Sequence, residues 1–60
     1  MNAETITRMF WEPKLDEMTT WLRETRGFSK NGARKAAVNF VETMAFVARE
    51  TGKPMLKEFR

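Results

Sequence analysis

The residues of this chain best suited to chemistry are carboxylates and bases, because the sequence contains no histidine and no cysteine. Without those two residue types, the common catalytic triads and the imidazole or thiolate metal sites cannot be assembled. Glu12, Asp16 and Glu17 are close enough in sequence to suggest an acid pair or a magnesium site. Their position at the start of an expected helix favours interaction with the helix dipole instead. We therefore predict a non-enzymatic protein with no catalytic residue, no metal and no cofactor.

The strongest charge feature is a group of bases between residues 23 and 35, here called the basic cluster. This segment has a net charge of +4, whereas the whole chain has a net charge of +3. The positive excess is therefore local, and it indicates an acidic partner, either a protein or a nucleic acid. The basic cluster consists of Arg23, Arg26, Lys30, Arg34 and Lys35.

The segment from Gly27 to Gly32 has the glycine spacing of a phosphate-binding P-loop. That motif requires a lysine followed by serine or threonine directly after the second glycine, and Ala33 and Arg34 follow here. We therefore exclude a nucleoside triphosphatase. Binding of a single anion by backbone amides of the loop stays open as a weaker alternative.

Two long helices are expected on either side of this loop. Pro13 suits the first position of a helix that ends at Gly27, since glycine readily takes the left-handed conformation of a helix end. The next helix is expected over residues 32–51, with a cap from Ser29 or Asn31. Its apolar residues recur at steps of three and four, which is the pattern of a wide core-facing stripe.

Shorter helical arms are expected at both ends of the chain, over residues 3–10 and over residues 55–59. Between the first arm and the second helix we expect extended backbone at Glu12 and its neighbour, because a residue before proline disfavours the helical conformation. Trp11 precedes this break. Its ring therefore either fills the core or lies outside it, and the sequence leaves both alternatives open.

These elements predict an all-α fold, a small helical bundle of two main antiparallel helices with short helical arms at both ends. We expect one domain over residues 1–60. With no signal peptide and no apolar run of membrane-spanning length, we expect a cytoplasmic protein without membrane association. Two long and two short helices leave much of each other's apolar surface uncovered. We therefore also expect a symmetric homodimer in which the helix over residues 32–51 packs against the same helix of a second copy. Its alanines allow close approach: Ala33, Ala36, Ala37, Ala45 and Ala48.

Phe46 is the candidate anchor for a partner. At 100° per residue it falls opposite the apolar stripe of its helix, among polar residues. An aromatic ring surrounded by polar groups is the usual anatomy of an interface hot spot. The alternative is that the C-terminal segment folds over the ring. The predicted partner-binding residues are Phe46, Lys30, Arg34, Lys35, Asn39 and Glu42.

We predict a small regulator that binds another protein with an acidic surface. Phe46 would be its apolar anchor, and Lys30, Arg34 and Lys35 would steer the approach. Accessory factors of phages and mobile elements often have this size and composition, which is an analogy of scale alone.

The alternative function is nucleic-acid binding. Residues 13–46 resemble a helix-turn-helix in outline, although Arg23 stands where that motif usually has a small residue. Salt separates the two functions, because phosphate contacts lose affinity steeply as the salt concentration rises. The nucleic-acid candidates are Arg26, Lys30, Arg34, Lys35 and Asn39.

Overall fold

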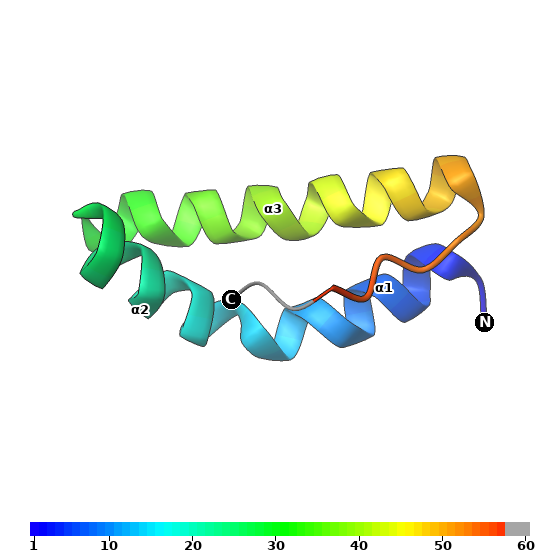
Figure 1. Ribbon diagram of the computed structural model, residues 1–60, viewed down its shortest axis with the longest axis horizontal. Helices are drawn as coiled ribbons and strands as arrows, with labels where there is room; N and C mark the ends of the chain where they lie inside the picture. The colour runs from blue at the N-terminus through cyan, green and yellow to red at the C-terminus, as the bar shows by residue number, and fades with distance from the viewer. Residues whose placement is uncertain (58–60) are drawn as a thin grey trace.

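A computed structural model of the chain describes residues 1–57 (Figure 1). They form α1 (Ala3–Trp11), a short 3-10 turn η1 (Glu12–Lys14), α2 (Leu15–Arg26) and α3 (Lys30–Thr51). The first three elements follow one another without a gap, and together they form one bent helix that packs antiparallel along α3 (Figure 1). The predicted all-α fold is confirmed. No helix in the described part of the chain is long and apolar enough to span a membrane.

The helices α1 and α3 begin at polar caps. The Asn2 Oδ1 accepts the Thr5 N–H at 2.8 Å at the start of α1, and the Ser29 Oγ accepts the Gly32 N–H at 3.1 Å at the start of α3. Each bond satisfies one of the backbone donors that a helix start leaves without a partner. Ser29 is therefore the cap and Asn31 lies inside the helix, so α3 begins two residues earlier than predicted.

Glycines end the two long helices, as predicted. Gly27 has a φ of 70° and Gly52 a φ of 73°, which is the left-handed region that side chains disfavour. The Gly52 N–H still bonds to the Ala48 carbonyl at 2.8 Å, which closes the last turn of α3.

The predicted extended break at Pro13 is wrong. Glu12 has a φ of −58° and a ψ of −40°, so the chain stays helical through the residue before the proline. Because proline lacks an N–H and its ring conflicts with the carbonyl four residues earlier, the helix tightens into η1 there. Packing of Phe10 and Trp11 against α3 outweighs the local preference for extended backbone.

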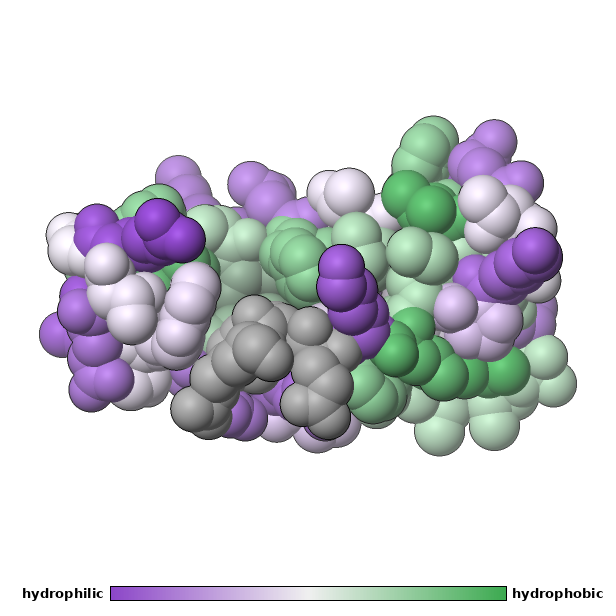
Figure 2. Space-filling view, viewed as in Figure 1, coloured by the Kyte–Doolittle hydropathy of each residue, from purple (hydrophilic) through white to green (hydrophobic). Residues whose placement is uncertain are grey.

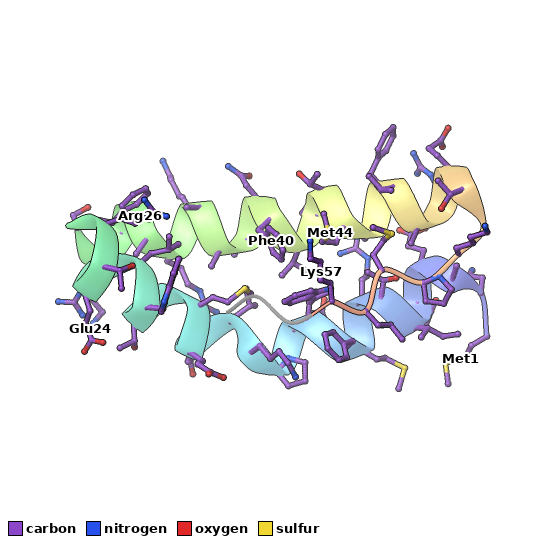
Figure 3. The ribbon with its side chains drawn as sticks, in the orientation of Figure 1. Met1, Glu24, Arg26, Phe40, Met44 and Lys57 are labelled. Carbon is purple, nitrogen blue, oxygen red and sulfur yellow. The ribbon has the colours of Figure 1, made fainter. Side chains whose placement is uncertain are left out.

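The core lies between the bent helix and α3, with Trp11 at its centre. Trp11 has no exposed surface, and its ring meets Phe10 and Phe40 edge-on, with centroid separations of 5.0 and 4.9 Å. Of the two alternatives for this ring, the structure therefore shows the buried one. Phe40 and Met44 point from α3 into the space between the helices (Figure 3). The core around Trp11 consists of Met18, Ala37 and Val41, with Phe10, Leu15 and Met44 packed against it.

Four of the five alanines of α3 are buried within the chain. Ala33, Ala37, Ala45 and Ala48 are at most 1% exposed, because the bent helix of the same chain covers them, whereas Ala36 is partly buried. Their small side chains let two backbones approach closely. The four buried alanines therefore pack against the chain's own helix, and a homodimer requires a different surface. The homodimer itself stays a prediction.

Residues 53–57, here called the strap, leave the end of α3 and return beside α1 without regular secondary structure (Figure 1). The predicted helical turn over residues 55–59 is therefore absent at residues 55–57, and its last two positions lie outside the described residues. The cause is a pair of hydrogen bonds between residues that are distant in sequence. Met55 bonds through its backbone to Thr7 and Trp11 of α1, and a helical turn would turn those groups away.

Candidate partner-binding surface

The predicted anchor lies exposed on α3. Phe46 is 54% exposed, although the neighbouring Ala45 is completely buried. The guanidinium of Arg49 lies over the Phe46 ring, 5.2 Å from its centroid, in a cation–π contact between residues one turn apart. The strap passes along α1, and residues 53–57 leave the ring more than half exposed. Phe46 is thus an exposed ring whose position is supported by a neighbour.

Three other predicted residues lie on the same side of α3 as Phe46. Lys35, Asn39 and Glu42 precede it by eleven, seven and four residues, which places all four on one face of a helix. All four are exposed. At 1.5 Å per residue the face is about 16 Å long, comparable to a short helical epitope. We call Lys35, Asn39, Glu42 and Phe46 the outer face of α3.

Within the outer face, Glu42 already has a partner in the chain. Its two carboxylate oxygens accept bonds from the two terminal nitrogens of Arg8 at 2.7 and 2.8 Å. This bidentate pair lowers the pKa of Glu42 and raises that of Arg8, mainly through the hydrogen bonds themselves. Arg8 also contacts Glu4 at 3.4 Å. Glu42 therefore ties α3 to α1, and its charge is compensated before any partner arrives.

The rest of the basic cluster lies beside the outer face. The Arg34 Nη1 donates to the Asp16 Oδ1 at 2.8 Å, so this side chain turns toward α2. Both partners are well exposed, and such pairs stabilise a fold only slightly. Arg26 lies over the Trp21 ring at 5.7 Å, and Lys30 is exposed at the first residue of α3. The basic cluster therefore surrounds the end of the molecule where α2 meets α3.

The arrangement of α2 and α3 differs from that of a helix-turn-helix. In that motif the two helices cross at about 90–120°. Here α2 turns at Gly27 and α3 runs back beside it, so the two helices form an antiparallel hairpin (Figure 1). The resemblance over residues 13–46 thus does not extend to the crossing of the helices, although the basic cluster itself is exposed.

The acidic residues near the start of α2 do not assemble into a metal site. No group of three acidic side chains within residues 1–57 is arranged to hold an ion. Asp16 contacts Arg34, so its charge is partly compensated by the basic cluster. Asp16 and Glu17 lie in the first turn of α2, where negative charge interacts favourably with the helix dipole.

Sequence reasoning missed Arg8 and Thr7, and for a common reason. Arg8 lies 34 residues from Glu42, and Thr7 lies 48 residues from Met55, so no local spacing connects either pair. The contact of Arg49 with Phe46 is different, because a spacing of three residues in a helix would have predicted it.

Comparisons with protein-family models, with curated proteins and with solved structures found no match for this chain.

Proposed function

We propose that this protein is a small non-enzymatic regulator that binds another protein through the outer face of α3. The observation that most supports the proposal is Phe46, a large apolar ring that stays 54% exposed while the opposite face of the same helix is buried. The contact with the Arg49 guanidinium favours one position of the ring. A side chain that is already positioned loses less conformational freedom on binding, so it suits the role of an anchor.

A partner with an acidic surface fits the charges around this anchor. Arg49 is exposed beside Phe46, and Lys35 is exposed at the other end of the outer face. Lys30 and Arg34 extend the positive charge toward the junction with α2. Charges at the rim of an interface mainly accelerate association, whereas a buried anchor mainly slows dissociation. Added salt should therefore reduce the association rate of the complex more than it raises the dissociation rate.

The test is a pull-down from lysate with the tagged full chain, run with and without nuclease, and compared with two variants. Phe46→Asp should lose a captured protein by roughly tenfold or more, as expected for removal of a hot spot. Phe28→Asp is the matched control, because Phe28 is also an exposed aromatic, at 41%, but lies outside the outer face. The captured protein is identified by mass spectrometry, and circular dichroism checks that both variants are folded.

Two results would contradict the proposal. If Phe46→Asp unfolds the chain, the ring supports the fold and the surface is misplaced. If both variants retain the captured protein equally, the outer face of α3 is not the binding surface.

Nucleic-acid binding is the second candidate, favoured by the exposure of the basic cluster at one end of the molecule. Arg26, Lys30, Arg34, Lys35 and Asn39 would then contact phosphates or a groove. Capture that disappears with nuclease, together with a steep loss of affinity as salt increases, would support this function. Phe46→Asp should then have little effect, whereas Lys30→Gln combined with Lys35→Gln should weaken binding.

A further inference from the structure

Met55 of the strap bonds through both of its backbone groups to buried side chains of α1. The Trp11 Nε1–H donates to the Met55 carbonyl at 2.6 Å, and the Met55 N–H donates to the Thr7 Oγ1 at 3.0 Å. Thr7 and Trp11 have no exposed surface, and they lie four residues apart on the same side of α1. The Thr7 hydroxyl donates its own proton to the Ala3 carbonyl at 2.8 Å, so its oxygen acts as an acceptor toward Met55.

These two side chains form a site for the backbone of a non-helical segment. Both are polar groups at the edge of a core, where a donor or acceptor without a partner is strongly unfavourable. The Thr7 hydroxyl accepts a backbone N–H, and the Trp11 indole donates to a backbone C=O. Together the two side chains bind both backbone groups of one residue. Something must occupy this site for the fold to be satisfied. In the structure the occupant is the chain's own Met55.

Most of the described strap residues bury little surface. Met55 is the one strap residue that is partly buried, whereas Lys53, Pro54, Leu56 and Lys57 are exposed. The segment that joins the strap to α3 begins at Gly52, where an added Cβ would meet nothing within 4 Å. Segments that bury little surface belong to the parts of a protein that open most easily.

We propose that the site of Thr7 and Trp11 also accepts the strap of a second copy, so that two chains exchange straps and form a homodimer. The strap of a second copy has the same sequence, so it recreates the contacts of Met55 without any new chemistry, as in domain swapping. This gives the predicted homodimer a surface different from the buried alanines of α3. It is independent of protein binding through Phe46.

In such a dimer, exposed apolar side chains of the strap and of the start of the chain would be covered. Leu56 of the strap is 51% exposed, and Met1 is 86% exposed. Figure 2 shows apolar surface close to where the chain begins. Two chains that exchange straps would lie side by side here, and each would cover part of the other's exposed apolar surface.

The chain's own strap competes with this exchange, because a short connection gives it a high effective concentration at the site. Exchange should therefore increase with protein concentration and with any change that hinders the strap from reaching its own site. Deletion of Lys53 is such a change, since it shortens the connection between α3 and Met55 by one residue while leaving Thr7, Trp11 and Met55 in place.

Sedimentation equilibrium from micromolar to millimolar concentration measures the effect. The unmodified chain should form a dimer at the upper end of the range, and the Lys53 deletion should lower the dimer dissociation constant by roughly tenfold or more. Trp11→Phe in the deletion background removes the indole N–H and should weaken the dimer. Phe46→Asp should leave the dimer unchanged, which separates this proposal from the proposed function.

A mixed sample of isotope-labelled and unlabelled chains locates the contact. Filtered nuclear Overhauser effects should connect the Trp11 indole N–H of one chain with the α-proton of Met55 of another. The proposal is overturned if the folded deletion variant stays monomeric at millimolar concentration, or if a dimer forms in which Trp11 contacts Met55 of its own chain only. Should the deletion unfold the chain, the same labelled mixture of unmodified chains decides, and absence of intermolecular effects at millimolar concentration overturns the proposal.

Discussion

The hydroxyl of Thr7 joins the beginning of the chain to its end. It donates to the Ala3 carbonyl at 2.8 Å and accepts the Met55 N–H at 3.0 Å inside the fold. Thr43 is a natural comparison, because its hydroxyl also donates to the carbonyl four residues earlier at 2.8 Å but lies on the surface. Sequence alone does not distinguish these two threonines. Their different burial decides how much each contributes.

We expect Thr7→Val to lower the free energy of unfolding by about 1–3 kcal/mol, because it leaves the partly buried Met55 N–H without its acceptor. Thr43→Val should change it by about 0.5 kcal/mol or less, as surface substitutions usually do. Urea denaturation followed by circular dichroism measures both. Equal effects of the two substitutions would mean that the bond to Met55 contributes nothing to stability.

The pair of Glu42 and Arg8 makes stability depend on pH. The hydrogen bonds from Arg8 lower the pKa of Glu42 below its ordinary value of 4.5. A group whose pKa is lower in the folded state binds protons more readily when unfolded, so its stabilisation is present above the ordinary value and is lost as the pH falls below it. Glu42→Gln should therefore lower the melting temperature at neutral pH. The difference from the unmodified chain should shrink as the pH is lowered below that ordinary value.

Glu50→Gln serves as the control for this pH dependence. Glu50 contacts its sequence neighbour Arg49 at 3.4 Å, on the same helix, and it connects no two elements. Replacement of Glu50 should leave the melting temperature unchanged both at neutral pH and at low pH. A deficit of Glu42→Gln that persists at low pH would show that the amide disturbs packing, and that the charge of Glu42 is not the cause.

At the scale of elements, α3 depends on small side chains where it meets the bent helix. Ala45 is completely buried, whereas Ala36 is only partly buried on the same helix. Ala45→Leu should lower the free energy of unfolding by about 1–3 kcal/mol, because extra methylene groups force two packed helices apart. Ala36→Leu should cost less, since its side chain has open space beside it. Thermal unfolding measures both, and an equal cost would contradict the close approach at Ala45.

The contact surfaces proposed here lie on different elements. The outer face of α3 contains Phe46, and the strap site lies on α1 between Thr7 and Trp11. Helical periodicity predicted that Phe46 lies opposite the apolar stripe of its helix, and it left open whether the C-terminal segment covers the ring. Helical periodicity could not predict the strap site, because Thr7 and Trp11 lie far in sequence from Met55. Periodicity also gives no reason to connect Arg8 with Glu42.

At the scale of the whole molecule, the core is small. The molecule measures 34 × 15 × 14 Å, and Trp11 and Thr7 are the largest fully buried side chains among the described residues. Buried alanines contribute little apolar surface each. A single core of this size rarely supplies more than about 3–5 kcal/mol. We expect the free energy of unfolding of the dilute monomer to lie in that range.

Urea denaturation at several protein concentrations checks this expectation. A dilute monomer far above the range would mean that contacts beyond those described stabilise the chain. A value that rises with protein concentration would show that association adds to stability, since a partner that binds only the folded state stabilises it by mass action.

The sequence by itself determined the helical class, the glycines that end α2 and α3, and the position of Phe46 opposite the apolar stripe of its helix. Each follows from local stereochemistry or from the period of a single helix, so a short stretch of residues is enough to decide it. Tertiary structure decided the helical path through Glu12, the burial of Trp11, the non-helical strap at Met55 and the exposure of the Phe46 ring. Contacts between distant residues outweigh local preference in the strap and at Glu12: packing on α3 keeps Glu12 helical, and two hydrogen bonds to α1 keep Met55 out of a helical turn.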